Sequence, residues 1–252
     1  MITVLTVNHN TLDFLKLLVQ SVRRFRGQVP TEIMVIDNQS TDGSREWAAA
    51  QPDVEAHLLT CNTGHGPGLD YGLRLVNTKF VLVLDSDAHL QRLDWDADLI
   101  KLYQSDSRRR LIAAKGGVEK PIHPCFMFFE TQYFRSNQFS FQARDGYDVG
   151  RRIYYDVTEA GFDVLRVECG YEDGSQNFYP GTYGTEYYIG GRPTIFHAWY
   201  ATRMTTCRIG DSVDNYKKED FLKDSALVFS MPLVREILAH EERSSNSSCP
   251  GP

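Results

Sequence analysis

Four short apolar segments alternate with amphipathic segments over residues 1–90, and this alternation limits the fold more than any other feature of the chain. Strands alternate their faces at every residue, whereas helices repeat about every 3.6 residues, so the two kinds of segment can be told apart. We expect strands at 2–7, 32–36, 54–60 and 80–84, and helices at 12–25, from Ser40 or Thr41 to Ala50, and from Pro67 to Val76. This order predicts an α/β fold with a mainly parallel sheet and right-handed crossovers.

The remainder of the chain is less regular. We expect helices at 95–104 and 150–160, strands at 111–114 and 162–167, an aromatic strand within 121–129, a long Gly- and Tyr-rich loop at 171–192, and helices over 216–240 that are interrupted at Pro232. The predicted organisation is one domain over 1–240, made of halves at 1–90 and 91–210 and C-terminal helices at 211–240, followed by a disordered tail at 241–252.

Composition excludes several classes of protein. The chain has 252 residues, 42% apolar and 24% charged, which is typical of a soluble globular protein. A net charge of −6 argues against broad nucleic-acid binding, which depends on Lys and Arg. No apolar run approaches about 18 residues, so we expect no transmembrane segment, although peripheral membrane association stays open. Five widely spaced cysteines, without a signal peptide, predict reduced thiols in a cytoplasmic protein.

Each predicted strand of residues 1–90 ends in a polar cluster. The clusters are residues 8–10, 37–44, 61–66 and 85–87. Because the carboxyl ends of parallel strands meet at one edge of a sheet, we expect the four clusters to form one binding site there.

The last cluster, Asp85-Ser86-Asp87, carries the strongest chemical signal. It follows a strand that is predicted to be buried on both faces, so both carboxylates can point the same way at the strand's end. Two adjacent hard oxygen ligands suit a divalent ion that carries a diphosphate. The alternative interpretation is a solvated acidic turn.

Two further clusters have both a binding and a structural interpretation. Asp37 is placed to accept hydrogen bonds from ribose hydroxyls or from a base imide, but residues 37–44 also fit a turn or a helix cap. Gly64, Gly66 and Gly68 precede or open a predicted helix, where backbone N–H groups favour an anion. Glycines of this kind are also common in simple turns.

Four segments together resemble the nucleotide-binding half of glycosyltransferase family 2. They are residues 3–8 (Thr-Val-Leu-Thr-Val-Asn), 35–44 (Val-Ile-Asp-Asn-Gln-Ser-Thr-Asp-Gly-Ser), 62–73 (Asn-Thr-Gly-His-Gly-Pro-Gly-Leu-Asp-Tyr-Gly-Leu) and 84–87 (Leu-Asp-Ser-Asp). The resemblance implies the GT-A fold, in which a Rossmann-like nucleotide-binding half with a mixed, mainly parallel sheet adjoins an acceptor-side half. The family usually has Asn at the position of Asp70.

The same resemblance implies roles for individual residues. Asp37 would hold the base or the ribose, and Asp85 and Asp87 would serve the ribose and a Mg²⁺ or Mn²⁺ ion, with Asp87 the more direct metal ligand. The nucleotide-binding set taken from these motifs is Asn8, Asp37, Asn62, Gly64, Asp85 and Ser86.

Two residues in the second half complete the predicted site. Residues 146–162 resemble the family segment that carries the catalytic base before a helix, which assigns that role to Asp148, although Tyr147 stands where the family has Glu. Asp148 can equally cap the helix that follows it, and Asp145 and Glu130 are the reserve candidates for the base. His197 resembles a late histidine that serves the metal or the diphosphate; the alternative is a packed core residue.

These assignments predict a metal-dependent inverting glycosyltransferase. By resemblance, the donor is a nucleotide-diphosphate sugar, with UDP or dTDP favoured, and the acceptor is a glycan or a lipid-linked molecule. Two alternatives stay open. One is a catalytically idle GT-A module that binds a nucleotide sugar or a partner. The other is a sugar-nucleotidyltransferase, which should carry a Gly-rich, basic loop after the first strand, where this chain has Asn8-His-Asn-Thr11.

Overall fold

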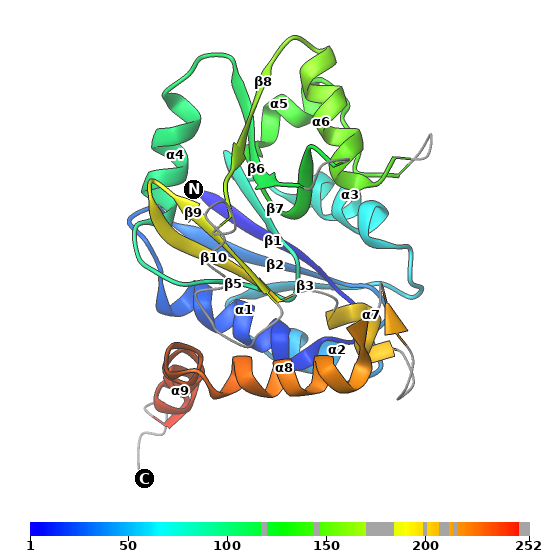
Figure 1. The fold of residues 1–252 in the computed structure, drawn as a ribbon, viewed down its shortest axis with the longest axis vertical. Helices are drawn as coiled ribbons and strands as arrows, with labels where there is room; N and C mark the ends of the chain where they lie inside the picture. Colours follow the sequence, from blue (N-terminus) through cyan, green and yellow to red (C-terminus); the bar gives the residue numbers. More distant parts are fainter. Residues whose placement is uncertain are drawn as a thin grey trace.

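A central sheet with helices on both faces forms the body of the molecule (Figure 1). The computed structural model describes residues 1–116, 120–143, 147–169, 184–198, 201–206, 212–213 and 216–246. Within them the large sheet has the strand order β3-β2-β1-β4-β7-β6-β8. Its strands are β1 (Ile2–Asn8), β2 (Thr31–Asp37), β3 (Val54–Leu58), β4 (Phe80–Leu84), β6 (Arg109–Lys115), β7 (Ile122–Glu130) and β8 (Asp163–Val167).

The sheet is parallel across its first half and mixed across its second. Strands β1 to β4 run parallel, as predicted. Strand β7 runs antiparallel to both β4 and β6, and β8 runs parallel to β6. Since β7 is antiparallel to β4, the start of β7 lies beside the end of β4. This register places residues from the second half of the chain at the edge where the first polar clusters meet.

Helices cover the two faces of the sheet. They are α1 (Leu12–Arg24), α2 (Ser44–Ala49), α3 (His65–Leu75), α4 (Trp95–Gln104), α5 (Thr131–Ser136), α6 (Val149–Glu159), α7 (Ala201–Thr206), α8 (Lys218–Ser230) and α9 (Pro232–Asn246). Figure 1 shows α3, α5 and α6 on one side of the sheet and α1, α2, α8 and α9 on the other.

The two apolar cores follow from the alternation of side chains along the strands. Val4 and Leu82 belong to the core under α1, whereas Leu5 and Val83, one residue further along, belong to the core under α3. All four side chains are fully buried. A strand that is apolar on both faces is therefore buried by two helical layers, as its sequence predicts.

A second, smaller sheet has the order β5-β10-β9, with β5 (Ala88–Leu90), β9 (Gly184–Ile189) and β10 (Arg192–Ala198). A short ribbon of β11 (Ser212–Val213) and β12 (Tyr216–Lys217) follows. Strand β5 begins directly after Asp87, and β10 pairs antiparallel with it. The small sheet thus lies beside the acidic motif.

The structure corrects three sequence expectations. The predicted loop 171–192 contains β9, since Gly184–Ile189 pairs with β10; residues 171–183 of it lie outside the described residues. Helix α9 continues to Asn246, into the predicted tail, and 247–252 also lie outside the described part. Helix α2 begins at Ser44, after Gly43 in a left-handed conformation, rather than at Ser40 or Thr41.

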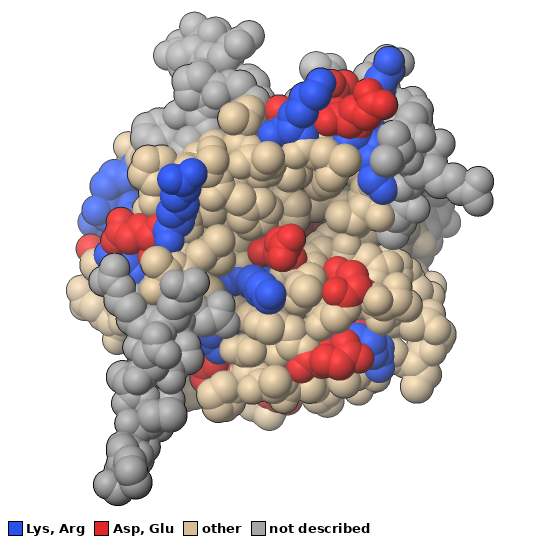
Figure 2. All heavy atoms as spheres, turned by 90° about the horizontal axis from the view of Figure 1, so that it is seen from below, with Lys and Arg blue, Asp and Glu red and all other residues tan. Residues whose placement is uncertain are grey.

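Within the part of the chain that the structure describes, charged side chains form no large patch of one sign on the face that carries α8 and α9 (Figure 2). Figure 2 shows the molecule from the side of α8 and α9, where the charged side chains in view lie in small, mixed groups among broad uncharged areas. Across the described residues, no helix combines the length and apolarity needed to cross a bilayer.

Candidate active site

The acidic motif forms the tight connection between β4 and β5. The backbone N–H of Asp85 donates to the carbonyl of Cys125 on β7 at 2.9 Å, so the sheet register extends to this residue. The N–H of Ala88 then donates back to the carbonyl of Asp85 at 2.9 Å, which closes a turn over Ser86 and Asp87. Both carboxylates are therefore held by backbone geometry at the carboxyl end of the sheet, as predicted.

His197 reaches the same place from a distant part of the chain. It lies on β10 opposite Ala88, and the neighbouring Ala198 N–H donates to the carbonyl of Asp87 at 2.9 Å. Its Nε2 lies 3.2 Å from Oδ1 of Asp87 and 3.6 Å from Oδ2 of Asp85. The residue is also buried. It is thus both packed in the core and aimed at the acidic motif.

The charge balance at this cluster favours a cationic group. Burial alone would lower the pKa of His197. Asp87 and Cys125, through their charges and hydrogen bonds to the ring, raise this pKa well above its usual value. The ring proton therefore offsets carboxylate charge in the absence of any other cation.

The donor set fits a divalent ion. One donor atom each from Asp85, Asp87 and His197 lie within 4.8 Å of one another. Oδ1 of Asp85 is buried and accepts no hydrogen bond from any described residue, although Nε2 of His65 lies 3.3 Å away. Two carboxylates and an imidazole are ligands that Mg²⁺ and Mn²⁺ accept. A buried carboxylate oxygen without a hydrogen bond, on a residue whose other oxygen faces His197, favours a nearby cation.

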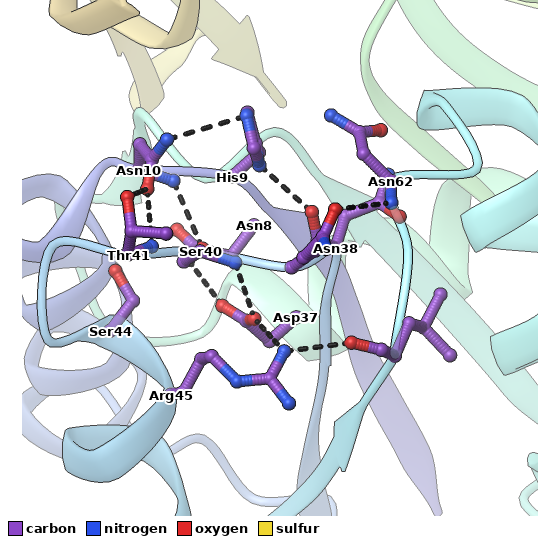
Figure 3. Close-up of polar contacts among 12 residues, drawn as sticks. Asn8, His9, Asn10, Asp37, Asn38, Ser40, Thr41, Ser44, Arg45 and Asn62 are labelled. Atoms are coloured by element: carbon purple, nitrogen blue, oxygen red, sulfur yellow. Dashed lines mark hydrogen bonds and ion pairs between the residues drawn. The ribbon is translucent and has the colours of Figure 1, made fainter.

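A second polar network connects the ends of β1 and β2 (Figure 3). Asn8 donates from Nδ2 to Oδ2 of Asp37 and to Oγ of Ser40, both at 3.0 Å. Oδ1 of Asp37 accepts from the Ser40 N–H at 2.9 Å and from Nη1 of Arg45 at 3.1 Å. Arg45 also donates to the carbonyl of Leu59 at 2.8 Å. The network ties three strand ends together.

Asp37 is fully buried inside this network. Both of its carboxylate oxygens are occupied by Asn8, Ser40 and Arg45, so it lies behind the surface of the site rather than on it. The predicted contact of Asp37 with a base or ribose stays a prediction. Asn8 is equally buried.

The exposed rim of the network is formed by the loop before α3. Asn62 is exposed; its N–H donates to Oε1 of Gln39, and its Oδ1 accepts from the Gly64 N–H at 2.9 Å. The Gly64 carbonyl in turn accepts from Nδ2 of Asn38 at 3.1 Å. Gly64 has a φ of +90°, which favours glycine at this turn. Asn62 and, in part, Gly64 are therefore accessible to a ligand, whereas Asn38 is buried behind them.

Gly66 and Gly68 have a packing role that the sequence did not reveal. A Cβ on Gly66 would lie 2.1 Å from the carbonyl oxygen of Phe141, and a Cβ on Gly68 would lie 3.0 Å from Val7. Both glycines let α3 pack closely against its neighbours.

Ser86 connects the two networks. The Thr11 hydroxyl lies 2.6 Å from Oδ1 of Asn8 and 2.9 Å from Oγ of Ser86. The predicted residues Asn8, Asp37, Ser86, Asp87 and His197 are therefore brought to one edge of the sheet.

Asp148 caps α6, which confirms the structural alternative for this residue. Its Oδ1 accepts from the Arg151 N–H at 2.8 Å, and its Oδ2 lies 2.9 Å from Nζ of Lys120. Burial would raise the pKa of Asp148, but the Arg151 N–H, the Lys120 ammonium and the charge of His123 together lower it. The carboxyl is therefore ionised at neutral pH.

The packing of α6 places Asp148 on the side of the candidate metal site. A Cβ on Gly150 would lie 2.9 Å from the carbonyl oxygen of Ile122, so the start of α6 touches the start of β7. His123, the next residue on β7, has its ring centroid 5.4 Å from that of His197. His123 thus lies between Asp148 and the Asp85–Asp87 cluster.

The two reserve candidates for the base do not compete with Asp148. Glu130 pairs with Phe80 at the first residue of β4, so it lies at the opposite edge of the sheet, and its assignment as a reserve base is wrong. Asp145 lies outside the described residues.

Sequence reasoning missed four polar residues of the site: Arg45, His65, Lys120 and His123. His65 lies inside one of the quoted motifs and Arg45 directly follows another, so their charge was a usable signal. Lys120 and His123 flank the start of β7, and only the antiparallel register of that strand brings them here.

Comparisons with known proteins give the chain a family context. The family model described as "Glycosyl transferase family 2" matches residues 3–148. None of the curated proteins compared with the chain matches it in sequence. Among solved structures, the mannosyltransferase PcManGT from Pyrobaculum calidifontis, in complex with GDP-Man and Mn²⁺, is similar with a TM-score of 0.54 at 16% identity, covering 100% of this chain and 76% of that one.

S. aureus TarS is similar with a TM-score of 0.54 at 15% identity, covering 91% of this chain and 44% of TarS. The chain thus spans less than half the length of TarS. Identities this low show the fold alone, and they confirm the predicted GT-A fold.

Proposed function

The chain belongs to glycosyl transferase family 2, and from this premise we propose that it is a metal-dependent inverting glycosyltransferase. It would transfer a hexose-type sugar from a nucleoside-diphosphate donor to an acceptor hydroxyl. The observation that carries the proposal is the convergence of Asp85, Asp87 and His197 at the carboxyl end of the sheet, with donor atoms within 4.8 Å.

The three residues would hold Mg²⁺ or Mn²⁺. Such an ion neutralises the charge that develops on a leaving diphosphate. Asp87 is held in place by its second oxygen, which accepts from the Ala201 N–H at 3.2 Å. Asp85 keeps a buried oxygen free of hydrogen bonds. The chain therefore orients the ligands before any ion binds, which reduces the cost of reorganisation.

Asp148 is proposed to accept the proton of the acceptor hydroxyl as that oxygen attacks the anomeric carbon. Its lowered pKa keeps the carboxylate ionised and ready to accept. Lys120 lies 2.9 Å from the same carboxylate. An acceptor that displaces this ammonium would leave Asp148 a stronger base in the complex than in the free enzyme.

The nucleotide would lie along the ends of β1, β2 and β4. Asn62 and Gly64 on the exposed rim are the proposed direct contacts, with Asp85 and Ser86 on the metal side. Asp37 and Asn8 would contact the nucleotide only if their buried network opened, and otherwise position Arg45 and Ser40. UDP or dTDP donors remain the proposal, and GDP sugars belong in any screen because PcManGT is in complex with GDP-Man.

We propose a glycan or lipid-linked acceptor and a cytoplasmic location, which is compatible with peripheral membrane association. The catalytically idle module and the nucleotidyltransferase are the alternatives. The loop after β1 supplies His9 and Asn10 but neither Lys nor Arg, which argues against a site for a triphosphate.

A thermal-shift screen tests the proposal. Nucleotide sugars are added with and without Mn²⁺, because a ligand that binds only the native state raises the melting temperature. We expect a specific donor to stabilise the protein only when Mn²⁺ is present. Turnover of that donor with acceptor mixtures then separates an enzyme from an idle binder. Stabilisation by every donor without metal would reject the metal-dependent assignment.

A further inference from the structure

A group of softer ligands lies directly beside the acidic motif. His123 and Cys125 are two residues apart on β7, so they share one face of that strand. One ring nitrogen of His123, one of His197 and Sγ of Cys125 all lie within 4.8 Å of one another. The backbone bond from Asp85 N–H to the Cys125 carbonyl holds this group against the Asp85–Asp87 turn.

The chemistry of this group differs from that of the acidic pair. Two imidazoles and a thiolate are preferred by Zn²⁺ and other thiophilic ions, whereas carboxylates suit Mg²⁺ and Mn²⁺. In a tetrahedral zinc site, ligand atoms about 2.0 to 2.3 Å from the ion lie about 3.3 to 3.7 Å from one another. The donor atoms of the three side chains, all within 4.8 Å of one another, lie in the range from which rotamer adjustment can reach these separations.

Burial and access also suit a metal site. Cys125 and His197 are buried, whereas His123 is partly exposed to solvent. The Cys125 N–H donates to Nδ1 of His123 at 3.2 Å, so the neutral ring has its lone pair on that nitrogen. An ion bound to Nδ1 would replace this hydrogen bond.

We propose that His123, Cys125 and His197 form a second metal site for a thiophilic divalent ion such as Zn²⁺, and that its occupancy removes His197 from the acidic site. A neutral imidazole has one lone pair, so it serves one ion at a time. Zinc bound here would therefore inhibit transfer supported by Mg²⁺ or Mn²⁺. This inhibition rests on the proposed function; the binding itself does not.

Cobalt is the probe for the site, because a Co²⁺–thiolate bond produces an ultraviolet charge-transfer band that oxygen ligands do not. Co²⁺ is titrated into the full chain under reducing conditions. We expect the band in the wild type and in Cys61→Ala, whose cysteine is exposed and distant in sequence, but not in Cys125→Ala. No band in the wild type, or a band that survives in Cys125→Ala, overturns the site.

A second variant guards against a folding defect in Cys125→Ala. His123→Gln keeps the thiol and removes one imidazole. It should retain a weaker band and bind Zn²⁺ more than about tenfold less tightly, since even outer-shell changes cost roughly that much affinity. Zinc affinity equal to that of the wild type overturns the site.

The activity arm uses Mn²⁺-supported transfer with rising Zn²⁺. We expect inhibition in the wild type and in the control Asp163→Asn, which lies at the exposed far edge of the sheet, and its loss in Cys125→Ala. Inhibition that persists in Cys125→Ala refutes the competition for His197. If no transfer is found under any condition, the proposed function fails, while the cobalt titration still decides whether the site exists.

Discussion

Asp148 has a structural role and a proposed catalytic role, and two substitutions separate them. Asp148→Asn keeps an amide oxygen that can accept from the Arg151 N–H but removes the charge and the basicity. Asp148→Ala removes the cap as well. We expect Asp148→Ala to lose more stability than Asp148→Asn, whereas both variants should lose transfer activity to the same extent.

The magnitudes follow from the contacts. Loss of an N-cap costs about 0.5 to 2 kcal/mol. The pair with Lys120 is partly exposed, so its loss costs about 0.2 to 1 kcal/mol. Asp148→Asn should thus be destabilised by less than about 1 kcal/mol, and Asp148→Ala by about 1 to 3 kcal/mol. For a chain of this size each kcal/mol lowers the melting temperature by about 2 to 4 °C.

Activity should fall by about 10² to 10⁴ in both variants, the usual contribution of a general base. Urea unfolding measures stability, and donor-dependent transfer at saturating Mn²⁺ measures rate. Asp163→Asn is the matched control, because Asp163 pairs with Arg108 at the exposed far edge of the sheet and should leave transfer unchanged. Wild-type turnover in Asp148→Asn would refute the base, and equal stability of Asn and Ala variants would refute the cap.

Three further predictions follow from the packing and charge of the described residues. Gly66→Ala places a Cβ 2.1 Å from the Phe141 carbonyl oxygen and should cost about 1 to 3 kcal/mol in urea unfolding; an unchanged midpoint would contradict the packing role. Burial would raise the pKa of Asp98, but Arg192 and Arg92 lower it. The ionised carboxylate therefore adds to the free energy of unfolding above its ordinary pKa of about 3.9, and this stabilisation is lost as the pH falls through the lower pKa of the folded state. Asp98→Asn should therefore be less stable than the wild type by up to about 1 kcal/mol at pH 7 and equally stable at strongly acid pH; a difference that persists in acid would refute this account. Lys120→Gln removes the ammonium that lowers the pKa of Asp148, so the acid limb of kcat/KM should move to higher pH, whereas an unmoved limb would separate Asp148 from catalysis.

Local sequence patterns predicted the strands and helices of residues 1–84, apart from the start of α2. Strand β4 was predicted at its observed bounds. Five successive apolar residues between a predicted helix and an acidic turn are too short for another helix and favour a buried strand. The convergence of the strand ends followed from topology alone, since parallel neighbours must end at one edge.

Features that depend on the pairing of strands far apart in the sequence could not be predicted from local patterns. Strand β5 has three residues, too few for a periodic signal, yet it is what pairs with β10 and delivers His197. His197 was proposed only through family resemblance. His123 and Lys120 became visible once the antiparallel register of β7 was known.

Burial of polar groups was the least predictable property. Asp37 was expected to accept hydrogen bonds from a ribose or a base, which requires a carboxylate that a ligand can reach, whereas the structure buries it. Its burial depends on Asn8 and Arg45, whose side chains reach it from two other elements. A carboxylate can be buried where such partners satisfy it, and sequence separation hides that arrangement.

Electron paramagnetic resonance of Mn²⁺ tests the central claim most directly, because it counts bound ions without requiring turnover. The wild type, Asp87→Asn and the control Asp163→Asn are titrated with Mn²⁺ in the presence of a nucleoside diphosphate. We expect one bound ion per chain in the wild type and the control, and at least about tenfold weaker binding in Asp87→Asn, as expected for a lost metal contact. Equal Mn²⁺ binding by all three proteins would contradict the assignment of Asp85, Asp87 and His197 as the metal site.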